Sequence, residues 1–169
     1  KQQPKKEPEK PKIMTPSQMV KELDKTVIGH TEAKKQIAVA FFRFLSERKN
    51  KARLKAMGKE FTKSNLRLTG VSGSGITFIL QELCSIVGLD CLLIDASTIT
   101  SEGYVGASLI DEVGKIYDVC DGDLERISSS VIILDEIDKL RASGGNDGKP
   151  DVNGSGATTL ILPPSGVIE

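Results

Sequence analysis

A glycine-rich segment in the middle of the chain has the composition of a phosphate-binding loop. Residues 70–77 read Gly-Val-Ser-Gly-Ser-Gly-Ile-Thr, directly after an apolar run and directly before an amphipathic one. Backbone N–H groups in such a turn wrap phosphate oxygens, because glycines permit a close approach and the following helix presents its positive end. Thr77 is placed to ligate a nucleotide-bound Mg²⁺. Taken alone, the segment also fits an ordinary connection between a strand and a helix.

The segment departs from the phosphate-loop pattern at one position. Such loops carry a lysine before the final serine or threonine, and this chain has Ile76 there. A charge-assisted hydrogen bond from that lysine to the β- and γ-phosphates contributes about 1.5 to 3 kcal/mol. Losing about 3 to 4 kcal/mol of transition-state stabilisation lowers a rate by about two to three powers of ten. We therefore expect weak nucleotide binding and very slow hydrolysis.

Two adjacent carboxylates follow a strongly apolar run. Residues 131–136 read Val-Ile-Ile-Leu-Asp-Glu, and ligands of open α/β sheets bind at the carboxyl ends of strands. In that position Asp135 would hold the water shell of Mg²⁺, and Glu136 would polarise the attacking water. Adjacent acids after a strand are also common at the start of a helix.

Together and in this order, the two segments favour a catalytic site for ATP or ADP with Mg²⁺. Thr77 and Asp135 are the expected metal-binding residues. The expected cofactor-binding residues of the loop are Gly70, Ser72, Gly73, Ser74, Gly75, Ile76, Thr77 and Phe78.

The spacing of apolar residues predicts the elements that position these groups. Strands are expected at 66–69, 91–94 and 131–134, and helices at 16–24, 31–45, 79–87 and 109–117. Residues 15–18, Thr-Pro-Ser-Gln, form a capping box with proline in the first turn, and Thr31 is the expected cap of the second helix. Because the strands are apolar on both faces and alternate with helices, we expect an α/β fold, a three-layer α/β/α domain with a mainly parallel sheet.

Composition restricts the partners and the boundaries of this domain. Lys plus Arg and Asp plus Glu are equal at 23 each, so no net field favours nucleic acid or a membrane, and we expect neither as a partner. Residues 1–13 are rich in lysine and proline and predict a disordered linker or tail, which leaves 14–169 for the domain. Residues 47–63 predict a helix end with a basic loop, and residues 141–156 a glycine-rich loop. Cys84, Cys91 and Cys120 lack the spacing of a metal site and are interpreted as small core residues.

Other segments carry a specific resemblance. Residues 27–30, Val-Ile-Gly-His, followed by Glu32-Ala33-Lys34, are similar to the start of the ATPase core of the ClpX and HslU protein unfoldases, which are AAA+ rings. Residues 103–106, Gly-Tyr-Val-Gly, are similar to their pore loop, and residues 135–139, Asp-Glu-Ile-Asp-Lys, to their Walker B segment. The resemblance runs from about Thr15 to Gly156, which is most of the chain.

The resemblance implies roles for residues that the two motifs do not contain. Val27, Ile28 and Gly29 would line an adenine pocket, although the residues alone also fit plain packing between two helices. Tyr104, with Gly103, Val105 and Gly106 around it, would push a substrate polypeptide through an axial pore; alone, it also fits a surface turn. The resemblance further implies a cytoplasmic chaperone, a hexameric unfoldase that feeds protein substrates to a ClpP- or HslV-like peptidase. His30 stands where the family usually has glutamine and is interpreted as a surface or capping residue.

Departures from the family leave a second interpretation open. Residues 162–164, Leu-Pro-Pro, interrupt a helix that the family continues, and the family's arginine finger, second sensor and helical lid are expected beyond Glu169. The first interpretation is the large ATPase subdomain of a ClpX-like subunit, weak or inactive in hydrolysis. The alternative is a non-hydrolysing regulatory module that binds nucleotide or protein. A metabolic or nucleic-acid P-loop enzyme is disfavoured by residues 103–106.

Overall fold

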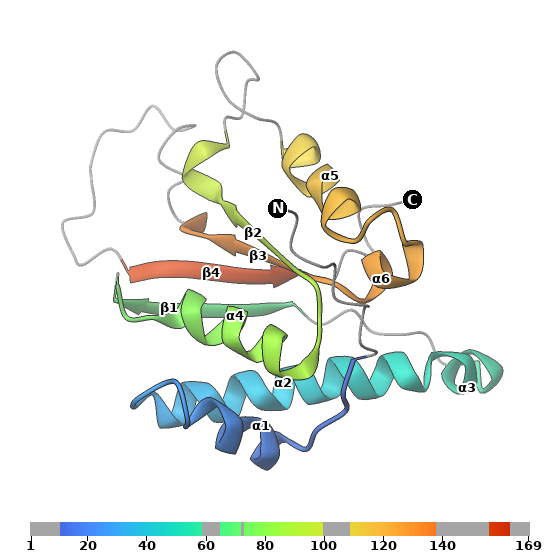
Figure 1. Cartoon of the computed structure of the whole chain (residues 1–169), viewed down its shortest axis with the longest axis horizontal. Coiled ribbons are helices and arrows are strands. Elements are labelled where there is room, and N and C mark those ends of the chain that lie inside the picture. Colours follow the sequence, from blue (N-terminus) through green and yellow to red (C-terminus); the bar gives the residue numbers. More distant parts are fainter. Residues whose placement is uncertain (1–10, 59–64, 72, 100–108, 138–155, 163–169) are drawn as a thin grey trace, which may run out of the picture.

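A mixed four-stranded sheet with helices on both faces organises the described part of the chain (Figure 1). The fold is known from a computed structural model, which describes residues 11–58, 65–71, 73–99, 109–137 and 156–162. The strands are β1 (Leu66–Val71), β2 (Cys91–Asp95), β3 (Val131–Asp135) and β4 (Gly156–Leu162). The helices are α1 (Pro16–Leu23), α2 (Thr31–Lys49), α3 (Lys51–Ala56), α4 (Ile76–Val87), α5 (Leu109–Val119) and α6 (Leu124–Ser129), with a short 3₁₀ turn, η1 (Ala96–Thr98), after β2.

The strand order is β1-β4-β3-β2, and β4 is the strand that the sequence did not predict. β2 pairs with β3 in parallel, whereas β4 pairs antiparallel with both β1 and β3. The three predicted strands therefore run in one direction, as expected. The expectation that a helix leads up to Leu162 is wrong, because residues 156–162 are extended. Their sequence, Gly-Ala-Thr-Thr-Leu-Ile-Leu, is rich in β-branched and aliphatic residues, which favour a strand.

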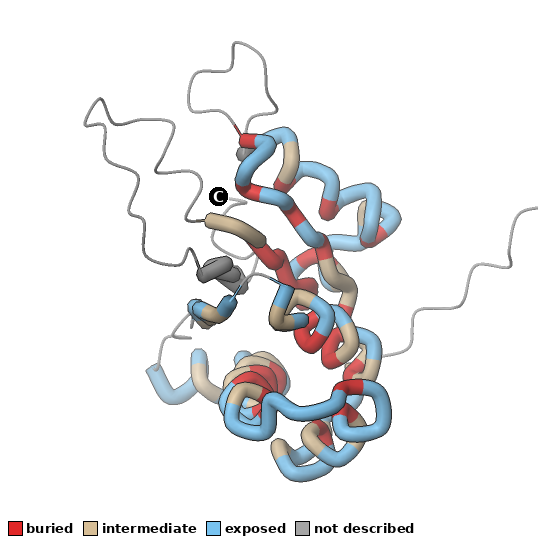
Figure 2. Tube along the Cα trace, turned by 90° about the vertical axis from the view of Figure 1, so that its left-hand side faces the viewer, coloured by how far each residue is buried: buried red, intermediate tan, exposed pale blue. Residues whose placement is uncertain are grey.

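β3 separates two hydrophobic cores. Val131 and Ile133 belong to the first core, with residues of α1, α2 and α4. Ile132 and Leu134 belong to the second core, with residues of β2, α5 and α6. All four side chains are buried, and buried positions follow the sheet through the middle of the chain trace (Figure 2). The expected three-layer α/β/α arrangement is confirmed.

The predicted helix starts are right for α1 and displaced for α2. At α1, the Gln18 N–H donates to Thr15 Oγ1 and the Thr15 N–H donates to Gln18 Oε1, which is a complete capping box. The expected cap of α2, Thr31, is instead its first helical residue, and His30 occupies the cap position with a left-handed backbone, φ 53°. His30 is exposed, in agreement with its interpretation as a surface or capping residue.

Two short helices, α3 and α6, were not predicted. In the basic segment 47–63, the expected helix end is confirmed by α2, which runs to Lys49, whereas α3 lies where a loop was expected. α6 begins after Asp123, whose carboxylate accepts hydrogen bonds from the N–H groups of Glu125 and Arg126. Such a side-chain cap satisfies N–H groups that have no partner within the helix.

The burial of the three cysteines agrees in part with their interpretation as core residues. Cys84 and Cys120 are buried, Cys91 is half-buried, and all three are free thiols. Burial raises the pKa of the Cys120 thiol to about 11, and a hydrogen bond with Cys91 together with burial raises the pKa of Cys84.

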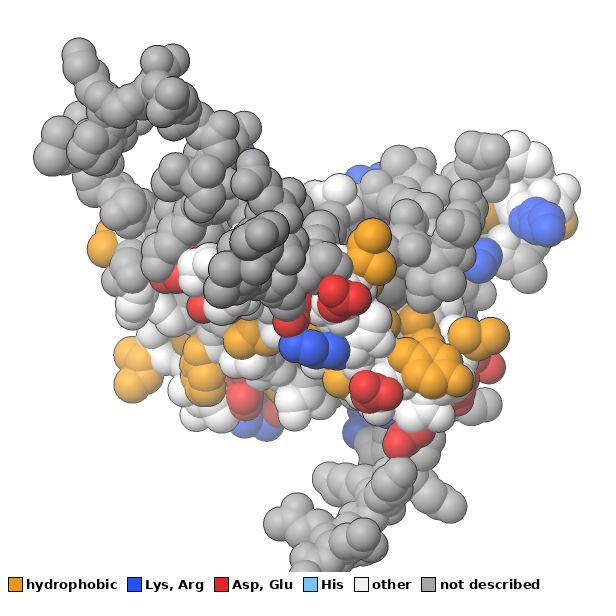
Figure 3. All heavy atoms as spheres, turned by 90° about the horizontal axis from the view of Figure 1, so that it is seen from above, with side chains coloured by type: hydrophobic (Ala, Val, Ile, Leu, Met, Phe, Trp, Pro, Cys, Tyr) orange, Lys and Arg blue, Asp and Glu red, His pale blue; other side chains and the backbone are white. Residues whose placement is uncertain are grey.

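At the amino-terminal end, the Lys12 N–H donates to the carbonyl of Val87, so contact with the domain begins inside the expected linker. None of the helices in the described ranges combines the length and apolar character needed to cross a bilayer. On the face that carries α5, acidic, basic and apolar side chains are interspersed (Figure 3).

The two-sided burial of β3 leads to a stability prediction. Ile133→Ala removes a fully buried side chain from the first core and is expected to lower the free energy of unfolding by about 2 to 5 kcal/mol, because a cavity remains. Leu93→Ala in the neighbouring strand is the matched control. Because Leu93 is 41% exposed, this change is expected to lower the free energy of unfolding much less. Urea unfolding followed by circular dichroism measures both; equal losses would contradict the assignment of β3 as the central buried strand.

Candidate functional site

The two predicted motifs meet at one edge of the sheet, where β1 and β3 end and α4 begins. The Thr77 hydroxyl donates to Oδ2 of Asp135 at 2.7 Å, which joins the first turn of α4 to the last residue of β3. Both side chains are half-buried. This edge lies at the left in Figure 1 and faces the viewer in Figure 2. The structure therefore brings together the two residues expected to bind a metal.

Backbone geometry fixes the orientation of the carboxylates. Oδ1 of Asp135 accepts the N–H of Glu136 at 3.0 Å, so both oxygens of Asp135 are engaged. Glu136 has φ 54°, in the left-handed region that residues other than glycine seldom adopt. Such a conformation costs about 1 to 3 kcal/mol and is found preferentially at functional sites. The turn at Glu136 takes the chain away from β3 directly after the carboxylate pair.

The glycine-rich turn leads into the start of α4. Gly73 and Gly75 have φ 76° and φ 83°, and the Ser74 N–H closes the turn on the Val71 carbonyl at 3.0 Å. The N–H groups of Ile76, Thr77 and Phe78 precede the first intrahelical bond, which runs from Ile79 to Gly75. The first N–H groups of a helix have no partner within the helix, and together with the positive helix end they suit an anion such as a phosphate.

Ile76 packs into the loop. Its side chain is half-buried and lies against the first core. A Cβ atom added at Gly70 would come within 2.5 Å of Ile76 Cδ1 and 3.1 Å of Ser74 Oγ, so the isoleucine fills the space beside Gly70. The described residues of the loop consequently offer N–H groups and hydroxyls, but no ammonium group.

The turn expected to line a base is on the same side of the molecule as the start of α4 in Figures 1 and 2. Val27 is buried in the first core, whereas Ile28 is 95% exposed. Gly29 has φ 76°. Of the three residues, only Ile28 and Gly29 are therefore on the surface, and Val27 is part of the core.

Lys34 is a further candidate that the sequence motifs do not single out. It is the buried charged residue of α2, and its ammonium donates to Asp24 and to the carbonyl of Val27. The sequence does contain a signal of this burial, because Lys34 lies on the apolar face of α2. That face continues through Ile37, Ala38, Phe41 and Leu45.

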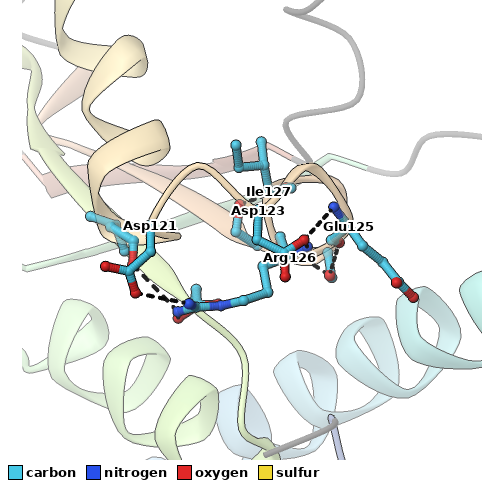
Figure 4. A network of polar contacts seen from close by, with 9 residues as sticks. Asp121, Asp123, Glu125, Arg126 and Ile127 are labelled. Atoms are coloured by element: carbon cyan, nitrogen blue, oxygen red, sulfur yellow. Dashed lines mark hydrogen bonds and ion pairs between the residues drawn. The ribbon is translucent and has the colours of Figure 1, made fainter. Parts of the chain in front are cut away.

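Ser72 and the expected pore loop, Gly103, Tyr104, Val105 and Gly106, fall outside the described residues. Arg126 lies at the opposite edge of the sheet: its guanidinium donates twice to Asp90, which directly precedes β2, and once to Asp121 (Figure 4). These hydrogen bonds to Asp90 raise the pKa of the guanidinium. Arg126 thus stabilises the far edge and makes no described contact with the site.

Comparison with known proteins shows the family of the chain. The model of the AAA family, ATPases associated with various cellular activities, matches residues 66–162. An ATP-binding subunit ClpX of the ATP-dependent Clp protease from Azotobacter vinelandii is 32% identical over 157 residues, which cover 90% of this chain and 36% of that protein. The ClpX subunit of Borrelia duttonii is 34% identical over 151 residues, 89% of this chain and 35% of its own length. The chain thus spans only about a third of the length of these relatives.

The contact between Gly70 and Ile76 leads to a prediction for a double-mutant cycle. Gly70→Ala is expected to lower the free energy of unfolding by about 1 to 3 kcal/mol, because the new methyl group meets Ile76 Cδ1. Ile76→Val removes that Cδ1 and alone costs about 0.5 to 1.5 kcal/mol. In the double variant, the loss of free energy of unfolding is expected to be about 1 kcal/mol smaller than the sum of the losses in the two single variants.

Chemical denaturation measures the three variants of the cycle. Gly114→Ala in α5 is the control, because an added methyl group there meets nothing within 4 Å and a helical Gly→Ala change is stabilising. Strict additivity of the two loop variants would show that Ile76 does not pack against Gly70.

Proposed function

The chain belongs to the AAA family of ATPases, and from that premise we propose that it is the nucleotide-binding core of a ClpX-like subunit in which hydrolysis is weak. The observation that carries the proposal is the hydrogen bond between Thr77 and Asp135 beside the open end of α4. A hydroxyl and a carboxylate beside the first N–H groups of a helix suit a magnesium-bound phosphate chain.

In this proposal, different residues contact the phosphates, the Mg²⁺ ion and the attacking water. The N–H groups at the start of α4 bind the phosphate oxygens, and Gly73 and Gly75 allow the loop to curve around them. The Thr77 hydroxyl and the Asp135 carboxylate are hard oxygen ligands suited to Mg²⁺, which neutralises charge on the phosphates when it is bound. Glu136 is placed one residue beyond Asp135 to orient and polarise a water molecule.

Ile76 reduces the activity of this site without removing it. The side chain supplies no charge and no hydrogen-bond donor, and it occupies the space beside Gly70. Binding through backbone N–H groups, Thr77 and Asp135 is retained, whereas stabilisation of charge on the transferred phosphate is lost. Nucleotide binding without efficient hydrolysis is the result that this arrangement favours.

The wider role follows from the relatives. The similar proteins are named ATP-binding subunits of the ATP-dependent Clp protease. We accordingly propose a cytoplasmic subunit that joins a hexameric unfoldase ring, holds substrate polypeptide with residues 103–106 and works with a ClpP-like peptidase. The alternative is a regulatory module that binds nucleotide without hydrolysing it, and the packing of Ile76 against Gly70 favours this second role.

The proposed effect of Ile76 is tested by restoring the lysine. Ile76→Lys is expected to tighten Mg-ATP binding by about ten- to a hundredfold, the equivalent of one charge-assisted hydrogen bond. Hydrolysis is expected to rise by about two to three powers of ten. Isothermal titration calorimetry and phosphate release measure the two effects.

Two control variants separate charge from shape and binding from chemistry. Ile76→Met has a similar length to lysine without the charge and is expected to bind as weakly as the natural chain. Glu136→Gln, combined with Ile76→Lys, is expected to keep the binding and lose the hydrolysis. Brisk hydrolysis by the natural chain would contradict the proposal, and tight binding by the lysine variant without any hydrolysis would favour the regulatory module.

A further inference from the structure

A buried ammonium group lies under the turn between α1 and α2. Lys34 is 1% exposed, and its Nζ donates to Oδ1 of Asp24 at 2.7 Å and to the carbonyl oxygen of Val27. Burying a charge is costly unless it is paired and hydrogen-bonded. Both partners belong to the turn, so the charge is retained where it fixes the backbone of residues 24–30.

Both backbone polar groups of Val27 are hydrogen-bonded, which holds the turn in place. The Val27 N–H donates to the Leu23 carbonyl at 2.8 Å, while the Val27 carbonyl accepts from Lys34. Gly29 and His30 then both adopt left-handed backbone conformations, which redirect the chain into α2. Between these fixed points, Ile28 is 95% exposed. An apolar side chain is therefore presented to solvent on a rigid segment.

The turn is connected to the phosphate-binding edge through the first core. Val27 belongs to the same buried cluster as Ile79 and Leu80 of α4. The turn also lies on the side of the molecule from which the start of α4 is open, in both views of the chain (Figures 1 and 2). A ligand whose phosphates bind at the start of α4 can extend its apolar, planar end toward Ile28.

We propose that Lys34 is a positioning residue for the purine base, because its buried ammonium holds the turn that presents Ile28 to the base of a nucleotide bound at α4. This inference rests on the proposed nucleotide-binding function. Lys34 itself touches no ligand; it acts through the carbonyl of Val27 and the carboxylate of Asp24. Its removal should weaken contacts with the base and leave contacts with the phosphates intact.

The experiment compares two probes that differ by an adenosine group. Dissociation constants for Mg-ADP and Mg-pyrophosphate are measured on the natural chain and on Lys34→Met, below the unfolding transition of each. Lys34→Met is expected to weaken ADP binding by about tenfold, the range for the loss of one apolar contact, and to leave pyrophosphate binding within about twofold, since the phosphate contacts are unchanged. Lys35→Met is the matched control, because Lys35 is an exposed neighbour paired with Glu32; it is expected to change neither constant.

Further variants separate positioning from folding. Lys34→Arg retains a cationic donor and is expected to recover part of the ADP affinity. Asp24→Asn removes one partner of the ammonium at an exposed position and is expected to weaken ADP binding alone, by about threefold. Glu22→Gln, at a surface pair with Lys25, is its control. If Lys34→Met does not fold, Asp24→Asn decides the question.

The outcomes distinguish the inference from the function on which it rests. Equal losses of ADP and pyrophosphate affinity in Lys34→Met, or no loss of ADP affinity in Asp24→Asn, would overturn the role of Lys34. A natural chain that binds ADP no better than pyrophosphate would overturn the base contact and leave phosphate binding in place. A natural chain that binds neither probe would overturn the proposed function, and this inference with it.

Discussion

The burial of β3 on both faces is the constraint on which the rest of the structure depends. Four consecutive aliphatic residues alternate between two cores, so helices must cover both sides of the sheet. The strand is parallel to β2 and in register with it through Asp95 and Asp135. Because the strand ends where its apolar run ends, the first carboxylate emerges at the carboxyl edge, within hydrogen-bond distance of Thr77. Core packing thereby determines the position of the site.

The two edges of the sheet have different properties. At the amino edge, Arg126 is hydrogen-bonded to Asp90 and Asp121, and this network fixes the ends of α5 and α6 (Figure 4). At the carboxyl edge, the first N–H groups of α4 precede its first intrahelical bond, and Glu136 adopts a costly backbone conformation. A hydrogen-bonded edge holds the scaffold in place, so that the residues at the other edge are positioned by the protein before a ligand binds.

The sequence predicted those parts of the fold that local patterns determine. The capping box at Thr15 and the apolar runs of β2 and β3 each correspond to an observed element. The strand β4 was not predicted, because the resemblance implied a helix leading up to Leu162; its β-branched residues instead favour a strand, which pairs with β1 and β3. Lys34 was missed as a functional candidate for a related reason: its burial depends on Asp24 and Val27, which are brought to it by the turn. The packing of Ile76 on Gly70 also needed three-dimensional coordinates.

The central claim is that a nucleotide binds at the start of α4, between the glycine-rich loop and Asp135. An NMR titration of the natural, isotope-labelled chain with Mg-ADP tests it most directly, because amide shifts report the location of even a weak ligand. The account predicts that the largest changes occur at the amides of Gly73, Gly75, Thr77 and Glu136, with little change at Arg126 and Asp90 on the opposite edge. Changes centred on that opposite edge, or no changes at saturating Mg-ADP, would contradict it.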